Sequence, residues 1–294
     1  MTVPDRVPYA GVMQLGFSTW AMPALPVERQ IALVRDAGYA TIELVNRGSL
    51  DAQRTDAAER RRIRAALDAA GLRLVSIASH GNLLEADNAK RDAQREIIHA
   101  GIDLAVDLAG PHGPPCVVTM AYGEPDQYEA VRDTVAANFA ELAEHASHRG
   151  VIVALEPHVG QAFDLPEKVA WLLEDVGSPW FRLNFDNSHF EVMGRGIDEY
   201  VPLLAPYSVH THVKDQRGVA PDYEFLIPGE GDFDYAHYLA ALSAAGYSGS
   251  VTVEISAQVQ RRPDYDPGAT AARSFDALLA AARKAGVTLQ HRAG

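Results

Sequence analysis

The stretch Val151-Ile152-Val153-Ala154-Leu155-Glu156-Pro157-His158 decides the fold of this chain. Its first five residues are apolar and mostly β-branched, which is typical of a short strand buried on both faces. Arg149-Gly150 has the composition of a helix end, and Pro157 ends the strand. Glu156 is therefore predicted to lie at the last position of a buried strand, where its charge needs an ion partner or a metal.

The same unit recurs along the chain: an alanine-rich amphipathic helix, a glycine, and a short β-branched run. Glycine suits the left-handed position that follows a helix, so each copy marks a return from helix to strand. With the less regular copies included, the sequence predicts eight strands and a helix after each. The strands are 15–19, 41–45, 72–78, 117–120, 151–156, 181–185, 209–213 and 251–255, and the helices are 27–37, 57–70, 90–108, 127–148, 166–176, 197–204, 234–245 and 269–285.

Strict alternation of strands and helices predicts a parallel sheet, and eight such units predict an α/β fold that closes into a (β/α)8 TIM barrel. A doubly wound open sheet is the alternative. It favours a glycine-rich phosphate-binding turn after the first strand, and residues 18–23 contain no glycine. We expect one domain over residues 1–294, with residues 1–13 as an amino-terminal extension.

Composition narrows the classes of function. No apolar stretch approaches the length of a membrane span, and the amino terminus lacks the apolar core of a signal peptide. Cys116 is the single cysteine, which fits a reducing, cytoplasmic setting. The net charge of −13 repels phosphate backbones, so nucleic acid is not an expected partner.

In a barrel of this type the carboxyl ends of the strands form the active site. Glu156, Asp186, His212 and Glu254 fall at the ends of four successive predicted strands. Each alone has a structural explanation, such as an ion pair, a helix cap or a buried histidine. Because neighbouring strands lie about 4.8 Å apart, the four side chains can converge on one ion. Three carboxylates and an imidazole suit Mn²⁺, Mg²⁺, Co²⁺ or Zn²⁺.

Other side chains at the strand ends are candidates for substrate binding. His189 lies three residues past Asp186, where it can bind a substrate hydroxyl or remain a loop histidine. His210 and His212 point to the same side of their strand, and His212 lies nearer the mouth, so His210 is expected one layer below. The further candidates are Trp20, Glu43, His80, His158 and Lys214.

Several motifs together resemble those of the xylose-isomerase-like barrel superfamily, in particular its sugar phosphate isomerase/epimerase branch. They are Leu155-Glu156-Pro157, Asp186-x-x-His189, His210-x-His212-Val213-Lys214-Asp215, the turn 227–234, and Val253-Glu254. The resemblance extends over nearly the whole chain. It is specific for the superfamily and weak for the substrate.

The resemblance implies a site and a reaction. In ketose 3-epimerases of this branch two glutamates, an aspartate and a histidine hold a divalent metal, and the glutamates move a proton on opposite faces of the reacting carbon. By position this implies Glu156, Asp186, His212 and Glu254 as ligands, with Mn²⁺ expected first and the two glutamates as the acid/base pair. The expected function is isomerisation or epimerisation of a keto-sugar or related polyol through a metal-bound enediolate.

The resemblance also implies further substrate-binding residues, and it shows where this sequence differs from the epimerases. It implies that His189 binds substrate, and it makes Arg217 the nearest candidate for a substrate arginine. A glutamate that the epimerases carry shortly after the fifth strand is absent here, where Gly160-Gln161-Ala162 stands. On the tail of the eighth strand, Arg261 or Arg262 can reach an anionic or polyhydroxylated substrate, or remain surface arginines.

Alternatives remain within the superfamily. Loss of a β-hydroxyl from the same enediolate would make the enzyme a dehydratase or lyase, similar to inosose dehydratase or to the subunit that cleaves 3-oxo C-glycosides with a partner chain. Hydroxypyruvate isomerase is another sibling, and a homo-oligomer is expected from the resemblance alone. The zinc endonucleases of the superfamily are excluded, because strand 117–120 lacks their histidines and the surface is acidic.

Overall fold

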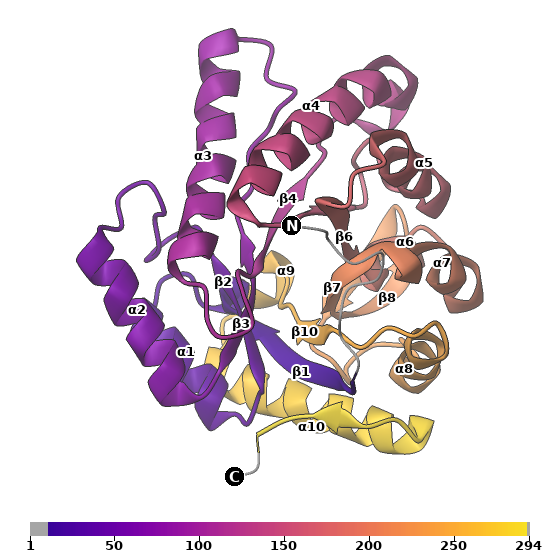
Figure 1. The fold of residues 1–294 in the computed structure, drawn as a ribbon. Helices are drawn as coiled ribbons and strands as arrows, with labels where there is room; N and C mark the ends of the chain where they lie inside the picture. The colour runs from indigo at the N-terminus through magenta and orange to yellow at the C-terminus, as the bar shows by residue number, and fades with distance from the viewer. Residues whose placement is uncertain (1–10, 293–294) are drawn as a thin grey trace.

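The computed structural model describes residues 11–292, and in Figure 1 their strands lie inside a ring of helices. Within this range eight parallel strands close into a barrel, because each pairs with its neighbour in the chain and the last returns to the first. The predicted TIM barrel is confirmed. The strands are β1 (Met13–Ser18), β2 (Thr41–Val45), β3 (Arg73–Ala78), β4 (Cys116–Met120), β5 (Val153–Glu156), β6 (Phe181–Asp186), β7 (Ser208–Val213) and β10 (Ser250–Val253).

Eight longer helices alternate with the barrel strands, within a few residues of the predicted ranges. Gly71, Gly150 and Gly286 each take the left-handed conformation after a helix, as the repeated pattern predicts, and Gly177 after α5 does the same. The helices are α1 (Val27–Asp36), α2 (Ala57–Ala70), α3 (Asn88–Asp107), α4 (Tyr128–Arg149), α5 (Pro166–Val176), α7 (Ile197–Leu204), α8 (Tyr235–Ala244) and α10 (Pro267–Ala285).

Shorter helices and a hairpin lie at the carboxyl end of the barrel. Helix α6 (Asn187–Glu191) directly follows β6, and α9 (Ala257–Gln260) follows β10. A two-stranded antiparallel hairpin, β8 (Asp215–Val219) and β9 (Asp222–Leu226), follows β7 and was not predicted from the sequence. The remaining short elements are β11 (Leu289–Gln290), which pairs with β1, and the 3₁₀ helices η1 (Thr19–Ala21), η2 (Pro125–Gln127) and η3 (Ala205–Tyr207).

Two of the three apolar clusters among the described residues contain side chains of the barrel strands. The larger lies between the strands and the helices, and the smaller contains Val45, Ala78, Val118 and Ala154. Buried polar side chains from β2, β3 and β7 accompany the smaller apolar cluster, so the fold holds charged groups close to the barrel centre. Most of the predicted amino-terminal extension, residues 1–10, lies outside the described residues. Across residues 11–292, no helix combines the length and the apolar character that a membrane span requires.

Candidate metal centre

The barrel brings the four predicted ligands together. Glu156 ends β5, Asp186 ends β6, His212 lies on β7, and Glu254 directly follows β10. One ligand atom from each lies within 4.8 Å of the others. The Nδ1 atom of His212 is 2.7 Å from Oε1 of Glu156 and 3.8 Å from Oε1 of Glu254. All but Glu254 are buried, so the cluster closes the inner end of the site.

Strand register explains this convergence. Asp186 stands opposite His212 in the parallel pairing of β6 with β7. The expected eighth strand is slightly shorter than predicted and ends at Val253, but the backbone N–H of Glu254 donates to the carbonyl oxygen of Val213 at 3.0 Å. The ends of neighbouring parallel strands therefore lie at one level, and side chains at these ends share one space.

Lys214 adds a positive charge to the cluster. Its Nζ atom lies 2.5 Å from Oδ2 of Asp186 and 2.5 Å from Oε2 of Glu254. Burial lowers the pKa of Lys214, but the two carboxylates outweigh burial and raise its pKa above the ordinary value. The side chain is therefore a permanent ammonium ion that pairs with two members of the cluster.

The donor set fits a hard divalent cation. Three carboxylates and one imidazole nitrogen are ligands that Mn²⁺ and Mg²⁺ accept in proteins. The Asp186 carboxylate is already fixed, because its Oδ1 accepts from the backbone N–H of Ser188 at 3.0 Å and from the Ser188 hydroxyl at 2.6 Å. A bound ion would share Asp186 and Glu254 with the Lys214 ammonium. The buried cluster could thus hold a metal.

Glu43 contacts the same histidine from inside the barrel. Both of its carboxylate oxygens lie 3.0 Å from Nε2 of His212, and Oε2 lies 3.3 Å from Nε2 of His210. The Ser18 hydroxyl donates to Oε1 at 2.6 Å, and the Ser76 hydroxyl donates to Oε2 at 2.8 Å. Glu43 is fully buried, so the structure places this predicted substrate-binding residue beneath the cluster rather than at the pocket surface.

The charges of these buried groups support one another. Burial alone raises the pKa of Glu43, but the charge of His212 and the hydrogen bonds from His210 and His212 hold it well below its usual value. Burial lowers the pKa of His212, yet Glu43, Glu156 and Glu254 raise it well above the ordinary value. Without a metal, His212 is therefore the cation between the carboxylates of β2 and β5.

A cavity of about 260 Å³ lies against the cluster. Glu156 and Glu254 line it, and so do the predicted substrate-binding residues Trp20, His80, His158, His189 and Lys214. The rings of His158 and His189 lie 4.0 Å apart, and His80 Nε2 is 4.0 Å from Oε2 of Glu156. The structure therefore gathers five of the predicted substrate-binding side chains around one space.

His189 is an unusual member of this lining. It is buried, and neither ring nitrogen has a hydrogen-bond partner among the described residues. Burial lowers its pKa well below the ordinary value, and the nearby charge of Lys214 lowers it further. Its imidazole is therefore neutral, with one donor and one acceptor nitrogen, and Nε2 lies 3.5 Å from Oδ2 of Asp186.

Comparison with known proteins assigns this barrel to a family. The family model described as xylose isomerase-like TIM barrel matches residues 31–281. The chain belongs to the xylose isomerase-like TIM barrel family. This confirms the resemblance that the sequence motifs indicate.

Relatives in this family carry names of several activities. The rhizopine catabolism protein MocC of Rhizobium meliloti is 28% identical over 78% of this chain and 74% of its own length. A putative hydroxypyruvate isomerase of Homo sapiens is 29% identical over 87% and 92%. An inosose dehydratase of Glaesserella parasuis is 28% identical over 41% of this chain and 46% of its own length.

Solved structures share the fold. An L-ribulose 3-epimerase aligns with a TM-score of 0.72 at 24% identity, covering 94% of this chain and 97% of the other. A D-psicose 3-epimerase, solved in the presence of D-fructose, aligns with a TM-score of 0.74 at 16% identity, covering 93% and 100%. The neighbours of this xylose isomerase-like barrel thus include sugar epimerases, and its sequence relatives include an isomerase and a dehydratase.

The hairpin β8–β9 places Arg217 away from the cavity. Arg217 is half exposed, lies 2.9 Å from Oε1 of Glu224, and donates to the carbonyl oxygen of Glu230 at 2.7 Å. Arg261 lines the cavity instead, whereas Arg262 pairs with Glu230 at 2.7 Å. Hairpin and α9 residues that the sequence did not single out also line the cavity: Tyr223, Phe225 and Gln258. The alternation Tyr223-Glu224-Phe225 was a signal for the strand that carries two of them.

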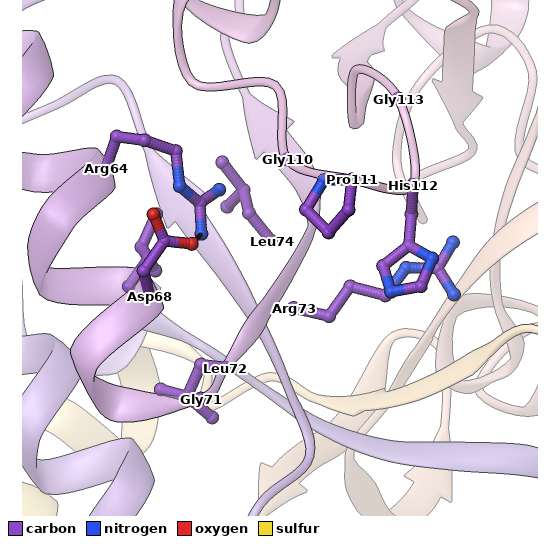
Figure 2. A pocket seen from close by; sticks show the side chains of 11 residues that line it. Arg64, Asp68, Gly71, Leu72, Arg73, Leu74, Gly110, Pro111, His112 and Gly113 are labelled. Carbon is purple, nitrogen blue, oxygen red and sulfur yellow. Dashed lines mark hydrogen bonds and ion pairs between the residues drawn. The ribbon is translucent and has the colours of Figure 1, made fainter.

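A second cavity, of about 200 Å³, lies at the amino ends of β3 and β4, near Leu72 and Gly113 (Figure 2). Arg64 and Asp68 line it and form an ion pair of 2.6 Å. In barrels of this kind the amino end of the strands serves stability, whereas catalytic groups come from the carboxyl end. The candidate site is therefore the cavity beside the cluster of candidate ligands.

Proposed function

We propose that the protein is a divalent-metal-dependent enzyme that isomerises or epimerises a small keto-sugar or related polyol. One observation carries the proposal: Glu156, Asp186, His212 and Glu254 converge beside a cavity that is lined with imidazoles. Mn²⁺ is the ion we expect first, and Mg²⁺, Co²⁺ and Zn²⁺ accept the same donors. The names of the epimerase and isomerase relatives agree with this class of reaction.

The two glutamates are suited to move a proton. Glu156 enters from β5 and Glu254 from the end of β10, so the strands β6 and β7 separate their origins and the carboxylates approach a ligand from different sides. When bound, the ion would polarise the substrate carbonyl and stabilise the negative charge left by the departing proton. One carboxylate removes the proton from the carbon next to the carbonyl, and the other returns one.

Other cavity residues are suited to bind hydroxyl groups. The neutral His189 offers one donor and one acceptor, and His158 and His80 stand beside it. Trp20 and Phe225 offer ring surfaces to the C–H groups of a sugar. A polyol meets both kinds of surface in this cavity.

Elimination is the second candidate reaction, and the inosose dehydratase relative favours it. The same proton removal followed by loss of a β-hydroxyl would make the protein a dehydratase or lyase. A 3-oxo C-glycoside lyase would also need a partner subunit, and an isomerase can work as a homo-oligomer. In either case we expect a cytoplasmic enzyme with a small-molecule substrate.

Metal analysis tests the proposed cofactor. The purified full chain should contain close to one divalent ion per molecule, and a chelator should abolish turnover that Mn²⁺ then restores. The proposed mechanism requires this, because the ion is the group assigned to polarise the substrate carbonyl. A metal-free protein whose turnover ignores chelator would refute the proposal.

Solvent exchange tests the acid/base pair. In D₂O, Mn²⁺-loaded protein should incorporate deuterium next to the carbonyl of at least one ketose, inosose or hydroxypyruvate, and NMR of the product separates an epimer or isomer from a dehydrated product. Glu156→Gln and Glu254→Gln should each lower the exchange rate by at least about 100-fold. Glu224→Gln, on the exposed hairpin, is the control and should exchange as the wild type does. Undiminished exchange in both site variants would rule out their roles.

A further inference from the structure

The two ring nitrogens of His212 face two different environments. Nδ1 points to the proposed ligand cluster, 2.7 Å from Glu156 and 3.8 Å from Glu254. Nε2 points into the barrel, where its nearest polar atoms are the two carboxylate oxygens of Glu43 at 3.0 Å. An imidazole that binds a metal through one nitrogen keeps its proton on the other nitrogen. In His212, that other nitrogen is the one that meets Glu43.

Glu43 is itself held firmly. The hydroxyl of Ser18 on β1 donates to one carboxylate oxygen, and the hydroxyl of Ser76 on β3 donates to the other. Both donors lie on the strands that flank β2, and all three residues have no exposed surface. Because two rigid strands hold it from either side, the carboxylate is fixed in the orientation that accepts from Nε2.

The space around Glu43 could instead hold a second metal ion. Glu43, His210 and His212 also offer three ligand atoms within 4.8 Å of one another, a set that could hold an ion of its own. Two serine hydroxyls already donate to this carboxylate, and the group lies fully inside the barrel. The contacts therefore favour a hydrogen-bonded support over a second metal site.

We propose that Glu43 is a positioning residue, which accepts the Nε2 proton of His212 and so directs the unprotonated Nδ1 toward the metal held by Glu156, Asp186 and Glu254. This inference rests on the proposed metal-dependent function. It assigns the serines of β1 and β3 a supporting role and gives Glu43 no contact with substrate. Glutamine at position 43 would present either an amide oxygen or an amide NH₂ group to Nε2, so it would no longer select one tautomer.

Calorimetric titration of chelator-treated full-length protein with Mn²⁺ measures the effect. Loss of such a supporting carboxylate typically weakens metal binding by about 10–100-fold, and we expect Glu43→Gln to do so. Ser76→Ala keeps the carboxylate but removes one hydroxyl, and it should weaken binding by about fivefold, the equivalent of one neutral hydrogen bond. Thr119→Val is the matched control. It removes a buried hydroxyl that has no hydrogen-bond partner in the described part of the chain, and it should bind Mn²⁺ as the wild type does.

Long-range ¹H–¹⁵N spectra of the Mg²⁺-loaded protein provide a second readout. Wild type should show His212 with its proton on Nε2 alone, and Glu43→Gln should show a changed or mixed pattern. If Glu43→Gln does not fold, the titration of Ser76→Ala decides the matter.

The outcomes separate the two proposals. Wild type that binds Mn²⁺ while both variants bind it equally tightly overturns the role of Glu43 and leaves the proposed function standing. Two ions per wild-type chain, one of them lost in Glu43→Gln, would show a second metal site and also overturn the role. Wild type that binds no divalent ion contradicts the proposed function and the inference together.

Discussion

Lys214 places a permanent positive charge among the carboxylates of the proposed metal site. Its ammonium pairs with Asp186 and Glu254 at 2.5 Å each. Several carboxylates in one buried place repel one another, and Lys214 and His212 offset that repulsion when no ion is present. These two positive charges would allow the fold to form without a metal. If the cluster binds an ion, Lys214 and that ion would compete for the negative charge of the carboxylates.

Lys214→Met should therefore make folding more dependent on metal. Without an ion, the variant leaves Asp186 and Glu254 without their ammonium partner, and we expect it to lose about 3 kcal/mol of unfolding free energy. Mn²⁺ should raise its melting temperature more than it raises that of the wild type. Thermal unfolding with chelator and with excess Mn²⁺ measures both effects.

Lys168→Met is the matched control for this experiment. Lys168 pairs with the buried Asp164 at 2.8 Å, and neither residue belongs to the ligand cluster or lines the cavity beside it. The control should lower stability, yet respond to Mn²⁺ as the wild type does. Equal Mn²⁺ responses in Lys214→Met and wild type would show that the lysine and the ion do not share the carboxylates.

At the scale of elements, the packing of α3 against α4 carries a pair of histidines. His99 on α3 stacks on His145 of α4 with ring centroids 3.9 Å apart. Glu96 and Arg95 are the other charged neighbours of His99, and Glu96 Oε1 is 3.5 Å from its Nδ1. Burial, and then the proximity of His145, lower the pKa of His99 below its ordinary value.

The lowered pKa of His99 determines how the free energy of unfolding changes with pH. As pH falls through about 6.5, the unfolded chain binds a proton at His99 before the folded protein does. The free energy of unfolding therefore decreases as pH falls from about 6.5 toward the folded pKa. His99→Gln should reduce the difference in stability between pH 7.5 and pH 5.5, measured by urea unfolding. His148→Gln, an exposed histidine on α4, is the control, and it should leave that difference unchanged; an unchanged difference in His99→Gln would contradict the stacking argument.

The elements also show what the sequence could and could not predict. The glycines after the helices mark where strands begin, so the barrel and the four candidate ligands at its strand ends follow from local pattern. The hairpin β8–β9 is short and largely polar, and its direction away from β7 depends on contacts distant in the chain, such as the Phe225 N–H with the side chain of Gln258 at 2.8 Å. The resemblance made Arg217 the nearest candidate for a substrate arginine, but the hairpin directs it toward Glu224.

The surroundings of Glu43 could not be predicted from the sequence either, because they depend on the whole barrel. Its place on the second predicted strand is evident from the sequence, but its partners come from β1, β3 and β7. Only closure of the barrel brings these strands around one carboxylate. Side chains that act at strand ends can thus be predicted from a repeat, whereas side chains that act across the barrel interior cannot.

Closure itself depends on a small residue at the seam. Gly16 on β1 stands opposite Thr41 of β2 and Thr252 of β10, where the last strand meets the first. A methyl group at Gly16 would collide with the hydroxyls of Thr41, Ser250 and Thr252. Those hydroxyls form a hydrogen-bonded chain, with 2.6 Å between Thr41 and Ser250 and 2.8 Å between Ser250 and Thr252.

Gly16→Ala should therefore destabilise the whole barrel, by about 1–3 kcal/mol for an overpacked interior. Urea unfolding measures the loss, and Ser250→Ala in the same chain should recover part of it because it removes one of the colliding hydroxyls. Gly11→Ala is the control: Gly11 is exposed, and no atom lies within 4 Å of the added methyl group there, so its cost should be small. If Gly16→Ala were as stable as that control, the space between β1, β2 and β10 would be able to accept a methyl group. Closure of the barrel would then not depend on glycine at position 16.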